Sequence, residues 1–266
     1  MTDGPGIHGT NAPIEHGWTV RTVTATGSTN ADMLAAIDRG ETLGGTVLRA
    51  EHQTAGRGRM DRKWDAPPGS NLLASLCFDD VPDEPAELTQ AVGSAAVRAV
   101  DRIHPSGGDV RDANRAGLKW PNDVLLGDAK LAGVLAQRSV RGPVVVGIGL
   151  NVRWAPDGSA CLARELGVDI EPLELLDLLL VELDEHLGLD SVARRSRYTE
   201  RLHTLGRTVR IQRPVGGDLV GVAEGIDEAG RLLVRSAGGE RVDDVGGVHV
   251  VDVGDIVHLR TPAIDQ

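Results

Sequence analysis

The sequence predicts an α+β fold with a small β-barrel at its C-terminus. Up to about residue 205, short apolar runs typical of strands are interspersed with longer segments of helical apolar spacing. From Gly206 onward only short strand patterns occur, and Gly-rich turns separate them, as in small barrels. We therefore expect one domain over residues 18–205, a barrel over residues 206–266, and a disordered segment over residues 1–17.

The first half of the larger domain is predicted to contain three strands and two helices. The Ser-Thr-Asn triplet at residues 28–30 can cap a helix that ends at Gly40. A second helix is predicted by the apolar spacing of residues 84–103. A loop of about twenty residues, 52–71, is long enough to be a candidate for function. The strands are expected at residues 18–25, 45–51 and 72–78.

The second half begins with a polar loop over residues 104–116 and a hairpin over residues 117–126, whose turn is Pro121-Asn122-Asp123. A strand pair is expected at residues 131–138 and 143–152, followed by helices at residues 171–188 and 190–205. The barrel strands are expected at residues 209–212, 219–226, 231–236, 241–244 and 255–260.

The overall composition is that of an ordinary globular protein, with 41% hydrophobic and 25% charged residues. No apolar run is long enough for a membrane span, and the N-terminus lacks a signal-peptide pattern. A net charge of −11 argues against a nucleic-acid partner. The cysteines, Cys77 and Cys161, are too few for a disulfide framework or a four-cysteine zinc site. We therefore expect a cytoplasmic protein without a membrane or nucleic-acid partner.

Lysine is rare in this chain, since only Lys63, Lys119 and Lys130 occur among 28 basic residues. The compact ammonium of lysine and the planar fork of arginine are not interchangeable. A lysine that persists in an arginine-rich sequence is therefore a candidate for a position where arginine does not serve.

The loop at residues 51–65 combines glycine with cations. Arg57, Arg59, Arg62 and Lys63 stand against a single acid, Asp61, within seven residues. Alternating glycine and arginine suits a strap that closes over a polyanion such as a nucleotide phosphate. A solvated loop or an RNA-binding strap remains an alternative at this point. The phosphate-binding motif GxxxxGK[ST] does not occur.

A second cluster of polar residues contains the other two lysines. It consists of Lys119-Trp120-Pro121-Asn122-Asp123 and, a few residues later, Lys130-Leu131-Ala132-Gly133. Each piece alone is typical of packing, a turn or a surface lysine. The joint occurrence with the arginine-rich loop favours a binding site.

These motifs together resemble those of bacterial biotin protein ligases. The resemblance rests on Ser28-Thr29-Asn30, on residues 53–59 (QTAGRGR), on the two segments of the second cluster, and on residues 147–152 (GIGLNV), in that order. It implies a class II synthetase-like biotin/lipoate ligase fold, in which a mixed, mainly antiparallel sheet packs against helices, with an SH3-like C-terminal barrel. It also implies a short form without the DNA-binding domain that some members carry.

The resemblance implies that the chain joins biotin to ATP, with Mg²⁺, to form biotinyl-5′-AMP. The biotin then passes to a lysine of a biotin carboxyl carrier domain. The implied biotin-binding residues are Ser28, Thr29, Asn30, Gln53, Arg57, Gly58, Arg59 and Lys130. The implied nucleotide-binding residues are Arg57, Arg59, Arg62, Trp64, Asn122, Asp123 and Asn151. The implied catalytic residues are Arg57, Arg59, Lys119 and Lys130. Metal ligands and the choice between monomer and homodimer stay open.

One residue departs from the pattern of the family, which usually reads GRGRxGRxW. This chain carries Asp61 where that pattern has its third glycine. An acid beside the phosphate-binding arginines could weaken the retention of the adenylate. Two alternatives are therefore kept: a lipoate or octanoate ligase or transferase, which shares the catalytic fold, and a catalytically weakened homologue that binds a partner.

Overall fold

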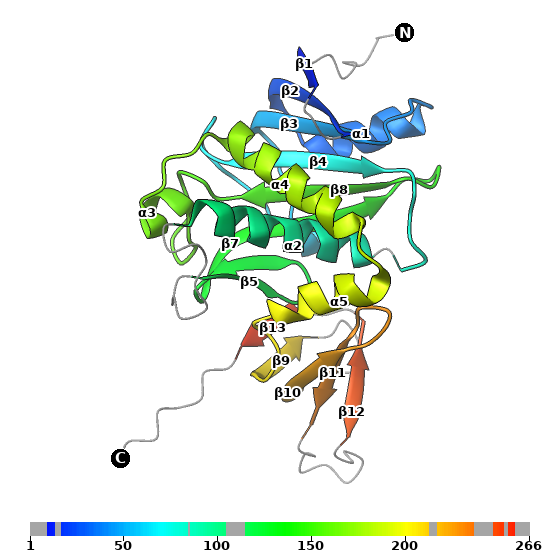
Figure 1. The fold of residues 1–266 in the computed structure, drawn as a ribbon, viewed down its shortest axis with the longest axis vertical. Helices are drawn as coiled ribbons and strands as arrows, with labels where there is room; N and C mark the ends of the chain where they lie inside the picture. Colours follow the sequence, from blue (N-terminus) through cyan, green and yellow to red (C-terminus); the bar gives the residue numbers. More distant parts are fainter. Residues whose placement is uncertain are drawn as a thin grey trace.

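The structure is a computed structural model and describes residues 10–13, 17–84, 86–104, 115–212, 217–236, 247–252 and 255–258. Its strands form one sheet of eight and one sheet of five (Figure 1). The strands of the larger sheet are β1 (Thr10–Pro13), β2 (Thr19–Thr26), β3 (Thr46–Gln53), β4 (Leu72–Phe78), β5 (Ala116–Lys119), β6 (Asp123–Leu126), β7 (Ala129–Arg138) and β8 (Val144–Leu150).

The larger sheet has the order β1-β2-β3-β4-β8-β7-β6-β5. Only β2 and β3 run parallel, because helix α1 (Thr29–Asp38) connects them, and every other neighbouring pair is antiparallel. The predicted mixed, mainly antiparallel sheet is thereby confirmed.

Helices cover both faces of this sheet. Helices α2 (Ala86–Ile103) and α4 (Pro172–Leu187) lie across one face and form the main core with it (Figure 1). Helix α1 covers part of the other face, where Met33 and Ile37 pack against Leu48, Cys77 and Val145. Since side chains alternate along a strand, Cys77 and Ser75 share the α1 side of β4. The short helix α3 (Leu162–Leu166) follows β8.

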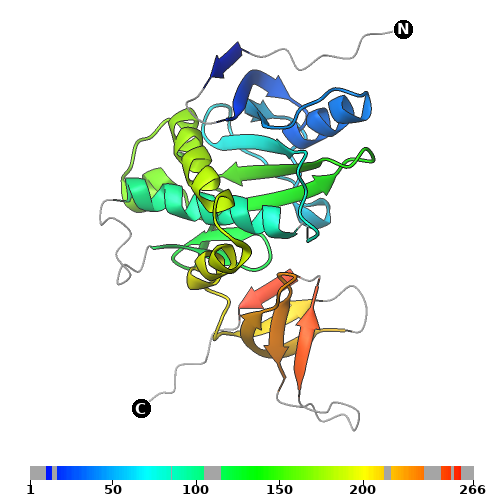
Figure 2. The same cartoon turned by 45° about the vertical axis from the view of Figure 1, so that its right-hand side comes forward.

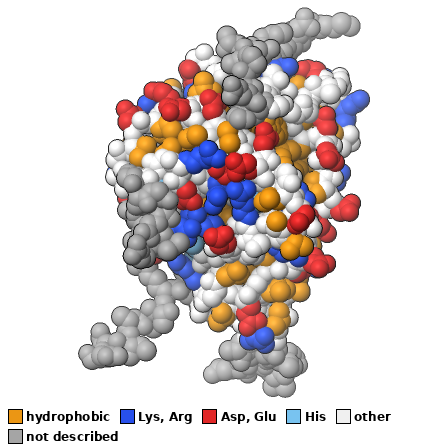
Figure 3. Space-filling model, viewed as in Figure 1, with side chains coloured by type: hydrophobic (Ala, Val, Ile, Leu, Met, Phe, Trp, Pro, Cys, Tyr) orange, Lys and Arg blue, Asp and Glu red, His pale blue; other side chains and the backbone are white. Residues whose placement is uncertain are grey.

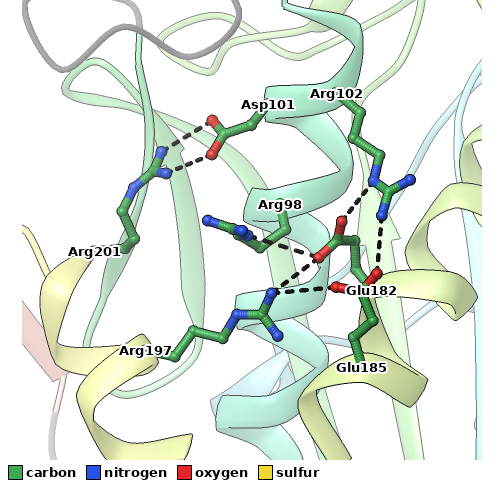
Figure 4. A network of polar contacts seen from close by, with 7 residues as sticks. All are labelled: Arg98, Asp101, Arg102, Glu182, Glu185, Arg197 and Arg201. Carbon is green, nitrogen blue, oxygen red and sulfur yellow. Dashed lines mark hydrogen bonds and ion pairs between the residues drawn. The ribbon is translucent and has the colours of Figure 1, made fainter. Parts of the chain in front are cut away.

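An ion-pair network joins α2, α4 and helix α5 (Ser191–Glu200) (Figure 4). Glu182 is buried, with 3% of its surface exposed. Its carboxylate forms ion pairs with Arg102 at 2.5 Å, Arg197 at 3.4 Å and Arg98 at 3.6 Å. Basic and acidic side chains lie next to one another near the middle of this face of the molecule (Figure 3). Burial of the Glu182 carboxylate carries a desolvation penalty. Its ion pairs with three guanidinium groups together offset that penalty.

The C-terminal sheet has the order β12-β11-β10-β9-β13 and is entirely antiparallel (Figure 2). Its strands are β9 (Thr208–Gln212), β10 (Leu219–Ile226), β11 (Leu232–Arg235), β12 (Val248–Val251) and β13 (Asp255–His258). A separate small sheet was predicted from residue 206 onward, and it begins within two residues of that position. Four valines of this sheet are exposed to solvent, namely Val220, Val222, Val248 and Val250.

Several hydrogen bonds attach residues 201–204 and the β10–β11 turn to the β5–β6 hairpin. Leu118 pairs with Arg201 and His203 through its backbone N–H and C=O, at 2.7 and 2.8 Å. The Trp120 backbone N–H donates to Thr204 Oγ1 at 3.0 Å, and its indole Nε1 donates to the Gly230 carbonyl at 3.0 Å. The hairpin that carries the Lys-Trp-Pro-Asn-Asp motif forms the edge of the large sheet and is therefore attached there to the C-terminal sheet.

Several elements differ from the prediction. Strand β1 lies inside the segment expected to be disordered, where its backbone pairs with β2. Helix α5 ends at Glu200 rather than 205, because Leu202 forms a bridge with Leu118 instead of continuing the helix. Strand β12 was not predicted, and the strand expected at residues 241–244 lies outside the described residues. So does most of the polar loop expected at residues 104–116. No helix among the described residues has the length and apolar character of a membrane span.

Candidate active site

A cavity of about 230 Å³ opens where the N-terminus of α1 meets the large sheet. The rest of its lining comes from the end of β3, the loop between β3 and β4, strands β4, β7 and β8, the β5–β6 turn and the segment that follows β8. The lining contains these residues expected from the sequence: Ser28, Thr29, Asn30, Gln53, Arg57, Gly58, Arg59, Arg62, Trp64, Asn122, Asp123, Lys130 and Asn151. The structure thus brings together segments that are more than a hundred residues apart in the chain.

Three glycines on β7 and β8 make the sheet side of the cavity. A Cβ on Gly147 would lie 2.3 Å from Asn30 Oδ1, and one on Gly149 would lie 2.3 Å from the Trp64 ring. A Cβ on Gly133 would lie 3.2 Å from the same ring. Only glycine permits these close approaches. Because these positions have no side chains, the Trp64 indole and the Asn30 amide can pack directly against the sheet.

Neutral polar groups form the wall at the N-terminus of α1. Ser28 occupies the N-cap position with extended backbone, and its side chain makes no capping hydrogen bond. The Thr29 backbone N–H donates to Gln53 Oε1 at 2.8 Å. Asn30 Nδ2 donates to the Leu135 carbonyl at 3.1 Å. All three residues of the triplet are buried, so the wall suits an uncharged ligand group with its own donors and acceptors.

The arginine-rich loop folds back on itself as a strap over the cavity. The Gly58 N–H donates to the Arg62 carbonyl at 2.7 Å, and the Trp64 N–H donates to the Gly56 carbonyl at 2.9 Å. Arg59 Nη1 reaches across to Asn122 Oδ1 at 3.0 Å. This contact ties the strap to the β5–β6 turn, so the two clusters identified in the sequence meet at one site.

The turn of the strap has an unusual backbone. Met60 and Asp61 have φ values of 54° and 56°, in the left-handed region that favours glycine. The conformation expected of a glycine at position 61 is thus present, but an aspartate adopts it. The side chain of Asp61 is exposed, on the solvent side of the turn.

Lys130 lies between an acid and an aromatic ring. Its Nζ is 2.7 Å from Asp123 Oδ1 and 5.7 Å from the centre of the Trp64 ring. Asp123 therefore acts in this structure as the partner of Lys130. The ammonium keeps a fixed position at the cavity, where it can attract an anion.

Asn151 is held mainly by the protein. Its Oδ1 accepts from Asn71 Nδ2 at 3.2 Å, and its Nδ2 donates to the Ala160 carbonyl at 3.0 Å. Asn71 is fully buried and also accepts the Val152 N–H at 3.0 Å. The Asn151 amide lines the cavity with one donor and one acceptor position still available.

Lys119 is the one expected site residue outside the lining of the cavity. It is the cross-strand partner of Asp123 at the end of β5. Its charge acts on His258 of the C-terminal sheet: burial, together with Lys119 and Arg207, lowers the pKa of His258 to about 4. The catalytic role expected for Lys119 stays a prediction.

The described part of the chain contains no group of three or more His, Cys, Asp or Glu side chains that could hold a metal ion. Acidic ligands at the cavity are limited to Asp123 and Asp65. Asp123 is already paired with Lys130. This donor set suits a Mg²⁺ ion that is bound chiefly through substrate phosphates.

Two family models match the chain. The biotin/lipoate A/B protein ligase model matches residues 24–153, and the biotin protein ligase C-terminal domain model matches residues 204–259. The chain is also 42% identical to the biotin–[acetyl-CoA-carboxylase] ligase of Mycobacterium tuberculosis, over 92% of this chain and 91% of that one. The chain belongs to the biotin protein ligase family.

The chain is also similar to other biotin protein ligases in sequence and in fold. The biotin–[acetyl-CoA-carboxylase] ligase of Paracoccus denitrificans is 34% identical, over 82% of this chain and 94% of that one. The structure of the biotin protein ligase from Aquifex aeolicus in complex with biotin and ATP superposes with a TM-score of 0.73. It is 24% identical and covers 91% of this chain and 99% of that one, a likeness that concerns the fold.

Sequence reasoning missed the residues that hold the cavity-lining side chains of this biotin protein ligase in place. Asn71, Ser75 and Gln137 bind side chains of the cavity through hydrogen bonds. Nothing in the local pattern distinguishes them from ordinary strand residues. Gly147 and Gly149 carried a usable signal, because two glycines separated by one residue in an apolar strand indicate a close approach of another group.

Proposed function

We propose that this chain forms biotinyl-5′-AMP from biotin and ATP and then transfers biotin to a lysine of a biotin carboxyl carrier domain. The observation that carries the proposal is one cavity in which a neutral polar wall and a cationic strap face the same space. The chain's membership in the family and the names of its relatives support the same reaction.

The cavity offers the two kinds of surface that biotin needs. The ureido ring of biotin has one carbonyl and two N–H groups, which match the uncharged groups of Ser28, Thr29, Asn30 and Gln53. Its carboxylate would then extend toward Lys130 and the arginines of the strap. Lipoate has no such N–H groups, and the polar wall therefore favours biotin over the lipoate alternative.

In the first step, a carboxylate oxygen of biotin attacks the α-phosphorus of ATP in line. The bond from that phosphorus to the bridging oxygen breaks, and pyrophosphate leaves. Two anions approach each other, so fixed cations that interact more strongly as charge builds up lower the barrier. Arg57, Arg59 and Lys130 are the proposed cations, with Arg62, Trp64, Asn122, Asp123 and Asn151 on the nucleotide side.

Mg²⁺ would enter with the triphosphate and neutralise part of its charge. The adenylate that forms is easily hydrolysed, so the strap also serves to keep water out. Its tie to Asn122 through Arg59 gives it a closed position over the cavity.

In the second step, the neutral amine of the carrier lysine attacks the carbonyl carbon of biotinyl-5′-AMP. An amide bond forms and AMP leaves with the bonding electron pair. The relatives are named for acetyl-CoA-carboxylase, so the proposed partner is the carrier domain of such a carboxylase. A cytoplasmic setting fits these substrates and the two free, buried cysteines.

We also propose that residues 18–205 form the catalytic domain and that the sheet beginning at β9 belongs to an SH3-like barrel over residues 206–266. The second family model, which starts at residue 204, supports this boundary. The hydrogen bond from the Trp120 indole to Gly230 indicates that the barrel supports the catalytic motif rather than acting as an independent module.

A transfer assay read by mass spectrometry tests the proposal. The purified protein is mixed with MgATP and an apo carrier domain, in parallel with biotin and with lipoate. We expect an ATP-dependent biotinyl adduct on the carrier lysine and none with lipoate. A lipoyl adduct would favour the lipoate ligase alternative, and no adduct with either acid would favour a catalytically weakened homologue.

A further inference from the structure

A buried chain of hydrogen bonds lies behind the polar wall of the cavity. Ser75 Oγ on β4 is 2.5 Å from Asn30 Oδ1 and 2.6 Å from Thr29 Oγ1. Gln137 Oε1 on β7 accepts from Asn30 Nδ2 at 2.9 Å. Thr29 and Asn30 line the cavity, whereas Ser75, which is fully buried, does not. Ser75 can therefore affect a ligand only through its two neighbours.

The direction of this chain follows from one backbone carbonyl. The Leu135 carbonyl can only accept, so the Asn30 atom 3.1 Å from it must be Nδ2. The oxygen Oδ1 then faces Ser75. Because Oδ1 can only accept as well, the single hydroxyl hydrogen of Ser75 goes to Asn30.

The hydrogen of Thr29 is also used within the protein. The single hydrogen of Ser75 goes to Asn30, so the Thr29 hydroxyl donates either to Gln53 Oε1 at 3.1 Å or to Ser75 Oγ at 2.6 Å. In either case a protein acceptor takes this hydrogen, and Gln53 Oε1 accepts the Thr29 backbone N–H as well. Both hydrogens of Asn30 Nδ2 are also in use, toward Leu135 and Gln137.

Thr29 Oγ1 and Asn30 Oδ1 consequently have lone pairs but no hydrogens left for a ligand. Gly147 makes this arrangement possible, since it lies opposite Ser75 on β8 and a Cβ there would press against Asn30 Oδ1 at 2.3 Å. The protein has thus fixed part of the wall as a hydrogen-bond acceptor before any ligand binds.

We propose that Ser75 is a positioning residue that determines specificity, because its hydroxyl holds Thr29 Oγ1 and Asn30 Oδ1 in place as hydrogen-bond acceptors and so selects an acid whose ring carries N–H donors. The inference rests on the proposed function, because the ureido ring of biotin is that kind of group. Ser75 touches no substrate, and its effect passes through the orientation of the two side chains beside it.

The test compares Ser75→Ala with the unaltered protein in biotin-dependent exchange of pyrophosphate into ATP. Removal of the Ser75 hydroxyl takes away a hydrogen-bond partner of Thr29 Oγ1 and leaves Asn30 Oδ1 without its donor, so both side chains are held less firmly. We expect the KM for biotin to rise about tenfold, the effect of roughly one hydrogen bond, with kcat and the KM for ATP unchanged. Ser75→Cys, whose thiol is only a weak hydrogen-bond donor, serves if the alanine variant does not fold.

Ser94→Ala is the matched control. Ser94 on α2 is also buried, its Oγ has no hydrogen-bond partner, and it does not line the cavity. The same deletion there should leave the KM for biotin unchanged. An equal rise in both variants would indicate a general loss of packing and overturn the proposal.

Biotin analogues separate positioning from a merely structural effect. In two monocarbamate analogues, a ring oxygen replaces one or the other ureido N–H. We expect at least one analogue to bind about tenfold more weakly than biotin to the unaltered protein, and the difference to shrink in Ser75→Ala. A difference of the same size in both proteins would overturn the proposal. If the unaltered protein shows no exchange with biotin at all, the proposed function itself fails.

Discussion

Lys130 is the side chain on which the two clusters of the site converge. It contacts Asp123 from its own motif region and the ring of Trp64 from the strap. An ammonium fixed on both sides does not have to reorganise when charge builds up on the reacting oxygens. Preorganisation of this kind is the usual source of large electrostatic effects in catalysis.

Replacing Lys130 with glutamine should therefore slow the formation of biotinyl-5′-AMP by about 10²–10³ in kcat. Single-turnover adenylate formation measures this effect directly. Lys130→Arg keeps the charge but changes its shape, so we expect it to restore only part of the rate. An unchanged rate in Lys130→Gln would remove this lysine from the chemistry.

Asp61 is the residue at which this chain departs from the family pattern, and its backbone has the left-handed conformation that glycine adopts freely. Asp61→Gly should relieve about 1 kcal/mol of backbone strain in the closed strap and remove an acid near the arginines. We expect a lower KM for ATP and slower release of biotinyl-5′-AMP, measured by steady-state kinetics and by adenylate half-life.

The variant Asp61→Asn separates the two causes, since asparagine removes the charge and tolerates the left-handed region. An effect in both variants points to charge, and an effect in Asp61→Gly alone points to the backbone. If neither variant changes adenylate retention or the KM for ATP, the strap tolerates the acid and the expectation is wrong.

At the scale of elements, most strands and helices were predictable because their apolar spacing reports burial directly. The hairpin turn at residues 121–123 and the strap at residues 52–71 were recognised from proline, asparagine and glycine. Helix α5 was predicted too long, because the pairing of Leu202 with Leu118 is a long-range contact without a local signal. Ser75 and Asn71 were not predicted as site residues for the same reason. Their hydrogen-bond partners, Asn30 and Asn151, are distant in the sequence.

The helices on the main face depend on the buried charge of Glu182. Glu182→Ala would leave Arg98, Arg102 and Arg197 without their shared partner between α2, α4 and α5. We expect a loss of about 3–5 kcal/mol in the free energy of unfolding, measured by urea denaturation. Glu185, 51% exposed and paired with two of the same arginines, is the control. Its alanine variant should lose less than about 1 kcal/mol, and equal losses would contradict the argument.

At the scale of the whole molecule, two histidines stay neutral in places that other parts of the fold create. Burial, together with Arg197 and Arg194, lowers the pKa of His186 on α4 to about 4. His258 on the C-terminal sheet has a similarly low pKa, and its ring nitrogens face Thr204 and Arg207. Both low values depend on tertiary contacts that disappear in the unfolded chain.

These histidines predict a loss of stability in mild acid. In the unfolded chain a histidine has a pKa of about 6.5, so between about pH 6.5 and pH 4 the unfolded state binds more protons than the folded state. The free energy of unfolding should therefore fall as the pH is lowered through this window. Urea denaturation across it, with His258→Asn beside the unaltered protein, checks the prediction. We expect a shallower slope in the variant, and identical slopes would contradict it.

The attachment of Leu118 and Trp120 to residues 201–204 also bears on how the protein is made. A ribosome delivers the β5–β6 hairpin about eighty residues before the segment that pairs with Leu118. Gly230 is made later still, 110 residues after Trp120, and until then the indole N–H of Trp120 lacks its acceptor. The nascent chain can thus build most of the large sheet early, while the motif edge of the cavity gains its remaining contacts only when residues 201–230 have been made. A premature stop between Arg201 and Gly230 would yield a protein with most of its large sheet but without these contacts.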